Sequence, residues 1–178
     1  MSEQQIRRLN LSNLTFEKYE AHHVGMAYAF KVNPLSCSNP EHFENYLKLS
    51  AIGDNAEGHM TTSVLVDNDG KGIAGYLSLR SSALIIEEST EPALEICCLA
   101  VNQEYEGNGI GSQLINMAMA IAMQVNEHFI GIRYILLAAE PKAVGFYKKN
   151  HFFELEQYYK MPLERKNEDC VPMMLRLY

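Results

Sequence analysis

Residues 94–114 read LEICCLAVNQEYEGNGIGSQL, an apolar run that passes through a glycine-rich loop into the start of a helix. The run Leu94–Val101 is apolar except for Glu95, and such a run predicts a central strand covered on both faces. Beyond the loop, apolar residues fall on one face of a 3.6-residue period, at Leu114, Ala118, Ile121 and Val125. The stretch therefore predicts a buried strand, a loop and an amphipathic helix in immediate succession.

The loop Glu106–Ser112 contains three glycines and predicts an anion-binding site. Glycines let the backbone approach a ligand closely, and the unpaired N–H groups at a helix start favour an anion such as pyrophosphate. The loop lacks the Gly-Lys-Ser/Thr ending of a P-loop. Its glycines also lack the Gly-x-Gly-x-x-Gly spacing of a dinucleotide-binding fold, so both of these nucleotide-binding classes are excluded.

The remaining segments predict a sheet interleaved with helices. Expected strands lie at Ile6–Leu11, Thr61–Val66, Ile73–Leu79 with an extension at Ala83–Ile86, Arg133–Ala139, Phe152–Leu155 and Met173–Leu177. Helices are expected up to about Phe30, from Asn39-Pro40 onward and over Pro141–Asn150, and loops at Val32–Asn39 and Gly53–His59. This order predicts one α/β (α+β) domain over residues 1–178, with a mostly antiparallel sheet, one parallel crossover and helices on both faces.

Composition narrows the class of protein. The chain of 178 residues suits a single domain, and no apolar run is long enough to span a bilayer. The first residues lack the apolar core of a signal peptide, which predicts a cytoplasmic protein. The formal net charge of −7 disfavours a nucleic-acid partner and suits a cationic one such as an amine. The cysteine and histidine spacings match no metal motif, so no metal is expected, and His22-His23 is expected to be a solvated pair.

From about Thr61 to Phe153 the chain resembles the GNAT family of N-acetyltransferases. The loop Glu106–Ser112 is similar to the family's Arg/Gln-x-x-Gly-x-Gly/Ala cofactor motif, except that Glu106 replaces Arg or Gln. The segments Tyr134–Ala139 and Ala143–Phe152 resemble the family's second half, with Glu140 where Asn is usual and His151 where Gly often precedes Phe. The resemblance implies the three-layer GNAT fold and acetyl-CoA as co-substrate. An acid at 106 would lie near the pyrophosphate, so the loop is expected to act mainly through its backbone N–H groups.

The resemblance also implies a set of site residues. Those expected to bind the cofactor are Leu99, Ala100, Val101, Glu106, Gly107, Asn108, Gly109, Ile110, Gly111 and Ser112. The backbone of the first three would pair with the pantetheine arm like an added strand. Tyr147 would face the coenzyme sulfur and donate a proton to the departing thiolate, unless it is simply an aromatic core residue. Glu95 is the candidate general base; its alternative role is a structural acid that reaches water or pairs with a cation.

Three functions remain open. The first is an N-acetyltransferase acting on a primary amine of a small molecule or protein. The second is a toxin-type acetyltransferase of aminoacyl-tRNA, whose known partner is a small neutralising DNA-binding protein. The segments Pro34–Pro40 and His128–Arg133 resemble such toxins, whereas the net charge of −7 argues against tRNA binding. The third is a non-catalytic acetyl-CoA-binding module. An edge strand near the C-terminus could pair across a homodimer.

Overall fold

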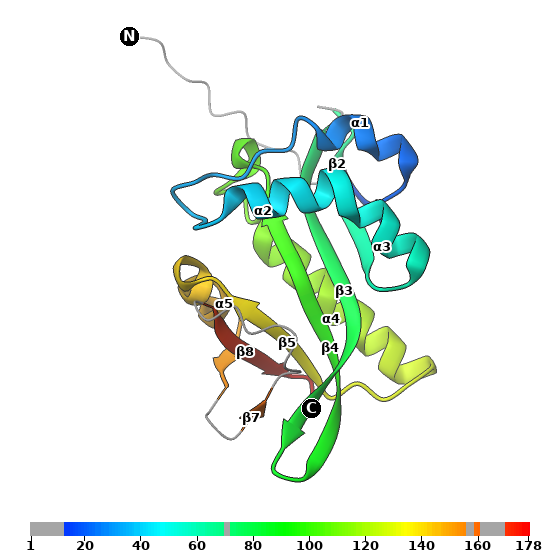
Figure 1. Ribbon diagram of the computed structural model, residues 1–178, viewed down its shortest axis with the longest axis vertical. Helices are drawn as coiled ribbons and strands as arrows, with labels where there is room; N and C mark the ends of the chain where they lie inside the picture. Colours follow the sequence, from blue (N-terminus) through cyan, green and yellow to red (C-terminus); the bar gives the residue numbers. More distant parts are fainter. Residues whose placement is uncertain (1–12, 70–71, 156–158, 161–169) are drawn as a thin grey trace.

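The computed structural model describes residues 13–69, 72–155, 159–160 and 170–178, which form a mixed sheet with helices on both faces (Figure 1). The strands run in the order β1-β2-β3-β4-β5-β8-β6, and β7 pairs with β3. They are β1 (Leu14–Lys18), β2 (Thr61–Asp67), β3 (Gly72–Ile86), β4 (Ser89–Val101), β5 (Tyr134–Ala139), β6 (Phe153–Glu154), β7 (Tyr159–Lys160) and β8 (Val171–Arg176). Neighbouring strands are antiparallel except β4 and β5, which are parallel.

The helices connect these strands and form the outer two layers. They are α1 (Val24–Ala27), α2 (Pro40–Asn45), α3 (Ala51–Glu57), α4 (Ile110–His128) and α5 (Val144–Lys149). A π-helical turn, η3 (Tyr46–Ser50), joins α2 to α3, and 3₁₀ turns lie at η2 (Ala21–His23), η4 (Gln103–Tyr105) and η5 (Pro141–Ala143). Within the described ranges, no helix combines the length and the apolar character that crossing a bilayer requires.

Alternation along the strands divides the core between the two faces of the sheet. Successive strand residues point to opposite faces. Val64 accordingly packs with Phe30 and Leu47 beneath α1, η3 and their neighbours, whereas the adjacent Leu65 packs with Leu114 of α4. The helices α4 and α5 therefore cover one face and the helices α1 to α3 the other, which confirms the predicted three-layer α+β fold.

The central prediction, a buried strand followed by a loop and a helix, is confirmed. The strand β4 lies inside the sheet, and α4 carries the chain across to the parallel strand β5. On α4, Leu114 and Ala118 are fully buried, while Ile121 and Val125 are partly buried and pack against the same core. The hairpin of β2 and β3 is also confirmed, and β3 continues through the predicted extension to Ile86.

Two predicted elements near the N-terminus are wrong. The helix expected up to Phe30 is interrupted by β1, whose Thr and Phe residues suit a strand and which pairs with β2. The loop expected at Gly53–His59 is instead mostly α3, which ends at Glu57 and is followed by Gly58 with a φ of +75°. A polar surface turn of helix has the same composition as a loop, so composition misled the prediction. The strand expected at Ile6–Leu11 lies outside the described residues.

Candidate active site

A slot opens where β4 and β5 part. The two strands pair only along Ala93–Ile96 and Tyr134–Leu137, and beyond this point β4 stays with β3 while β5 stays with β8. A cavity of about 460 Å³ lies at the slot, with walls from the ends of both strands, the glycine-rich loop, the start of α4, and α5. The predicted cofactor residues that line it are Leu99, Ala100, Val101, Glu106, Gly107, Gly109, Ile110, Gly111 and Ser112. Nine of the ten residues predicted to bind the cofactor thus line one cavity.

Cys97 forms a β-bulge beside this cavity. Ser78 of β3 pairs with Cys98, but the next residue, Leu79, pairs with Ile96, so Cys97 is the extra residue. A bulge leaves its extra residue out of the regular hydrogen-bonded ladder and re-aims the strand. Cys97 also lines the cavity, so the bulge shapes the cavity wall near the point where β4 and β5 part. The sequence has no glycine or proline here to signal the bulge.

The glycine-rich loop is braced so that its backbone faces the cavity. Gly107 and Gly109 have φ values of +76° and +78°, a backbone conformation that residues other than glycine rarely adopt. The remaining cofactor candidate, Asn108, supports the loop instead of lining the cavity: its Nδ2 donates to the carbonyl oxygens of Tyr105 and Glu106, each at 3.1 Å. The helix α4 begins at Ile110, so the N–H groups of its first turn and the positive end of its dipole lie at the cavity wall.

The segment Val32–Asn39, which we call the strap, spans the slot from one strand end to the other. Glu106, just after β4, accepts hydrogen bonds from the strap through both carboxylate oxygens. Glu140, just after β5, accepts a hydrogen bond from the backbone N–H of Ser38 at 2.7 Å and one from the thiol of Cys37 at 3.2 Å. Lys142 Nζ donates to the Pro34 carbonyl oxygen at 3.2 Å. Both carboxylates that depart from the family motif therefore hold the same segment.

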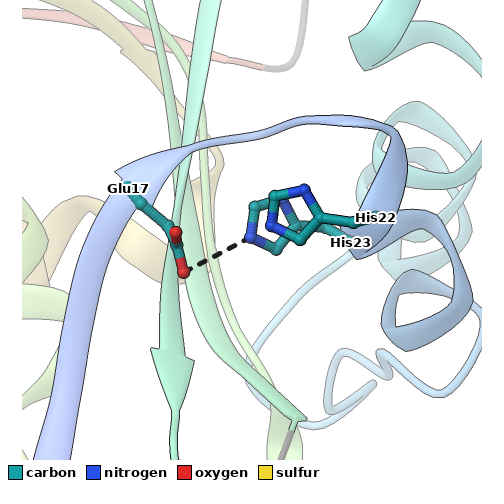
Figure 2. A group of neighbouring side chains, drawn as sticks. All are labelled: Glu17, His22 and His23. Carbon is teal, nitrogen blue, oxygen red and sulfur yellow. Dashed lines mark ion pairs between the residues drawn. The ribbon is translucent and has the colours of Figure 1, made fainter.

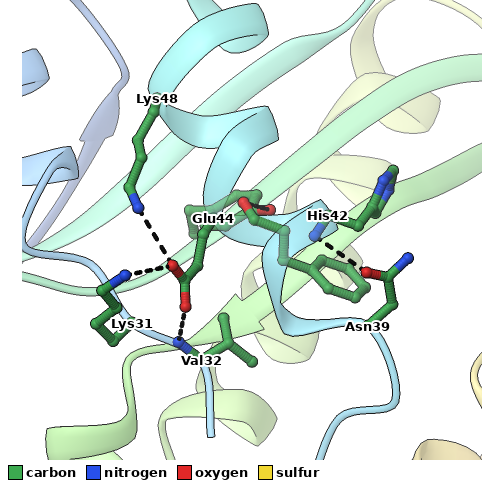
Figure 3. Close-up of polar contacts among 8 residues, drawn as sticks. Lys31, Val32, Asn39, His42, Glu44 and Lys48 are labelled. Carbon is green, nitrogen blue, oxygen red and sulfur yellow. Dashed lines mark hydrogen bonds and ion pairs between the residues drawn. The ribbon is translucent and has the colours of Figure 1, made fainter. Parts of the chain in front are cut away.

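The start of the strap is anchored by a buried carboxylate (Figure 3). Glu44 of α2 accepts hydrogen bonds from the Val32 backbone N–H at 3.1 Å, from Lys31 Nζ at 2.8 Å and from Lys48 Nζ at 3.2 Å. Burial alone would raise the pKa of Glu44, but these hydrogen bonds outweigh it and lower the pKa. In the same helix, the Asn39 side chain caps the first turn by accepting from the His42 N–H, which confirms the predicted helix start.

Tyr147 lies on α5, is 8% exposed and lines the cavity. Its ring packs edge-to-face against Phe146 and Phe152, with centroid separations of 5.0 Å and 5.7 Å. Burial, and to a lesser degree the nearby Cys98 and Glu140, raises the pKa of Tyr147 well above its usual value. The phenol therefore stays protonated at neutral pH. Both interpretations of this tyrosine, as a core residue and as a proton donor beside the ligand, are compatible with its position.

Glu95 lies in the middle of the sheet and pairs with a cation. It is 2% exposed, stands opposite Arg80 in the β3–β4 register, and accepts a hydrogen bond from Arg80 Nε at 3.0 Å. It is not among the residues that line the cavity. The ion pair is the contact expected of a structural acid, whereas the role of general base stays a prediction.

Matched variants at the two ends of this pair separate the roles. We expect Glu95→Gln and Arg80→Gln each to lower the free energy of unfolding, by about 1–3 kcal/mol, because each removes one charge of a largely buried pair. Chemical denaturation measures this effect. A pH–rate profile in which only Glu95→Gln loses turnover, most strongly at low pH, would establish Glu95 as the base. Equal stability in the wild type and both variants would contradict the structural importance of the pair.

Figure 2 shows a separate cluster of Glu17, His22 and His23, whose potential metal-ligand atoms lie within 4.8 Å of one another. His23 is buried, so the expected solvated pair is wrong for this residue. Its Nδ1 accepts a hydrogen bond from the Glu20 backbone N–H at 3.0 Å, and the neutral ring then carries its proton on Nε2, 3.4 Å from Glu17 Oε1. A protonated nitrogen has no lone pair for a metal. The hydrogen bond between His23 and Glu20 belongs to a capping box at the start of η2.

The comparison with known families agrees with this geometry. Residues 15–152 match the acetyltransferase (GNAT) family, and the chain belongs to that family.

Solved structures of similar fold cover nearly the whole chain. A tyrosine-to-phenylalanine mutant of the toxin AtaT, bound to acetyl-CoA and the C-terminus of the antitoxin AtaR, has 19% identity and a TM-score of 0.75, covering 93% of this chain and 94% of its own. AtaT complexed with acetyl-methionyl-tRNAfMet has 18% identity and a TM-score of 0.68, covering 89% and 93%. A tyrosine-to-phenylalanine mutant of KacT has 18% identity and a TM-score of 0.69, covering 93% and 95%. At these identities the similarity establishes a shared fold.

Proposed function

We propose that this acetyltransferase moves the acetyl group of acetyl-CoA directly to a primary amine. The observation that carries the proposal is that one cavity is lined both by the glycine-rich loop at the start of α4 and by the buried Tyr147. The pyrophosphate would be held by the backbone N–H groups of the loop, and the pantetheine arm would pair with the exposed edge of Leu99–Val101. The thioester would then lie near Tyr147.

We assign each chemical step to groups of this chain or to water. The amine attacks the thioester carbonyl carbon, and the negative charge that develops on the oxygen would be stabilised by hydrogen-bond donors at the cavity wall. As the carbon–sulfur bond breaks, the electron pair leaves with the sulfur, and Tyr147 donates its proton to that thiolate. The proton lost from the amine passes to water or, as predicted, to Glu95.

We propose the α-amino group of an aminoacyl-tRNA as the acceptor. Among the described residues that line the cavity, the carboxylates are Glu106 and Glu140, and both are engaged by the strap. A site with its carboxylates so engaged suits an amine of which an appreciable fraction is already neutral. An α-amino group has a pKa of about 7.7–8.0, against about 10.4 for a lysine side chain, so a far larger fraction is neutral at pH 7.

The structural comparisons support the same acceptor. The similar structures include a toxin in complex with acetyl-methionyl-tRNAfMet and toxins in complex with antitoxins. They favour the toxin-type alternative over the expectation that the net charge disfavours a nucleic-acid partner. A neutralising protein partner like AtaR belongs to this proposal. The second candidate acceptor is a small cationic amine, which the net charge of −7 would attract.

A transfer assay with radiolabelled acetyl-CoA distinguishes the acceptors. The panel contains charged tRNAs, the matching free amino acids, polyamines and a lysine peptide. We expect label on one or more aminoacyl-tRNAs, recovered as N-acetylated amino acid after deacylation, and little on the free amines. Label on small amines alone would select the second candidate. Acetyl-CoA binding with no transfer to any acceptor would contradict catalysis and favour a non-catalytic module.

A further inference from the structure

We propose that Asn33 and Ser36 of the strap are positioning residues for the cofactor site. They hold the Glu106 carboxylate on the strap, so that the loop presents backbone N–H groups, and not a negative charge, to the pyrophosphate of acetyl-CoA. The inference rests on the proposed cofactor site and adds to it two residues that fix the position of a negative charge. It assigns a reason for an acid at a loop position where the family motif has Arg or Gln.

The hydrogen bonds that carry the inference occupy both oxygens of the carboxylate. Asn33 Nδ2 donates to Glu106 Oε2 at 2.7 Å, and Ser36 Oγ donates to Oε1 at 2.6 Å. Hydrogen bonds to a charged group are short and strong, and two of them fix the orientation of the group. The strap itself is anchored at the Val32 N–H by Glu44 and at the Ser38 N–H by Glu140. The Glu106 carboxylate is therefore bound to a strap that is itself anchored on both sides of Asn33 and Ser36.

An unrestrained carboxylate at this position would oppose cofactor binding in two ways. Glu106 lines the cavity as the first residue of the loop, so its charge would repel a nearby pyrophosphate. A mobile acid at a helix N-terminus also competes with the ligand for the same backbone N–H groups and the same dipole. Holding the carboxylate on the strap prevents this competition and weakens the repulsion, because its orientation is fixed and two donors stabilise its charge. Binding of Glu106 by the strap and binding of acetyl-CoA are consequently coupled, and each should favour the other.

Asn33 and Ser36 also shape the strap, so the test must detect charge specifically. Asn33 Oδ1 accepts from the Leu35 backbone N–H at 3.0 Å, and the Asn33 carbonyl oxygen lies 3.2 Å from Ser36 Oγ. Asn33→Asp keeps an acceptor for the Leu35 N–H but replaces the donor to Glu106 with a second negative charge. Glu106→Gln removes the charge while keeping the length of the side chain. In the double variant Asn33→Asp, Glu106→Gln, the amide at position 106 can donate to the carboxylate at position 33, which reverses the direction of the original hydrogen bond.

The experiment measures the dissociation constants of acetyl-CoA and of S-acetylpantetheine, which lacks the pyrophosphate, by calorimetry with competition. We expect Ser36→Ala and Asn33→Asp each to weaken acetyl-CoA by about tenfold, within the usual range of coupling between sites, and to leave S-acetylpantetheine unchanged. Adding Glu106→Gln to either variant should restore the acetyl-CoA affinity. Leu35→Ala, at a strap side chain that is 85% exposed, is the matched control and should bind like the wild type.

The outcomes separate this inference from the proposed function. If the wild type binds acetyl-CoA and the strap variants bind it equally well, the inference is overturned and the proposed function stands. If both ligands weaken together, or if Glu106→Gln restores nothing, the strap acts through shape and the inference is also overturned. A wild-type protein that binds neither ligand would overturn the proposed cofactor site and the inference with it. Thermal melting confirms that each variant compared is folded.

Discussion

Gly109→Asp should abolish acetyl-CoA binding while the protein stays folded. The residue has a φ of +78°, and a Cβ built there meets no atom within 4 Å, so the folded chain has room for the side chain. The left-handed conformation would cost about 1–2 kcal/mol for a residue other than glycine. The aspartate would, however, place a negative charge immediately before α4, where the pyrophosphate is proposed to bind. Calorimetry with acetyl-CoA should therefore show no heat of binding.

Gly58→Asp is the matched control for this prediction. Gly58 follows α3 with a φ of +75°, also has no atom within 4 Å of a built Cβ, and is not a cavity-lining residue. The two variants should thus lose similar stability, and only the one at Gly109 should lose affinity. Gly111 is a less clean site because a Cβ there would lie 2.9 Å from the Phe146 ring. Wild-type affinity in folded Gly109→Asp protein would contradict the loop assignment.

Tyr147→Phe should slow acetyl transfer by about 10²–10⁴-fold, the usual contribution of a general acid. Phenylalanine keeps the ring that packs against Phe146 and Phe152, so stability and acetyl-CoA affinity should change little. The pH dependence provides a second readout. Because burial raises the pKa of Tyr147, its proton should remain available as the pH rises through 10.0, the ordinary value for tyrosine. The wild-type rate should show no loss from this group over that range.

Tyr134→Phe provides the control for removal of a buried phenol. Tyr134 is 6% exposed and packs in a separate small core with Leu84 and Leu136, away from the cavity-lining residues. Its variant should transfer acetyl groups at the wild-type rate. Single-turnover measurements compare the two substitutions directly. A Tyr147→Phe rate equal to that of the wild type would assign Tyr147 to the core alone.

The parts of the fold that were predictable are those encoded locally. The apolar run of β4, the glycines after it and the helical period of α4 are each visible within a few residues. The strand β1 and the helix α3 were missed because surface elements carry mixed polar composition, and only their packing on β2 and on neighbouring helices identifies them. The bulge at Cys97 was missed because it depends on register with β3, which no local pattern reports.

For the candidate site, too, the unusual residues could be predicted from the sequence but their partners could not. The sequence indicated that Glu106 and Glu140 are unusual, but their partners in the strap are 70 and 102 residues away at Ser36 and Ser38. Contacts over such separations depend on tertiary structure. The position of Glu95 was likewise predictable as strand-central, whereas its ion pair with Arg80 required the pairing of β3 with β4.

The most direct measurement of the central claim is a crystal structure of the protein with acetyl-CoA. The account predicts that the pyrophosphate accepts hydrogen bonds from backbone N–H groups of Gly107–Gly111, at about 2.7–3.2 Å. It also predicts the pantetheine arm along Leu99–Val101 between β4 and β5, with the sulfur within hydrogen-bond reach of the Tyr147 hydroxyl. A cofactor bound outside the slot, or a sulfur atom far from Tyr147, would contradict the account.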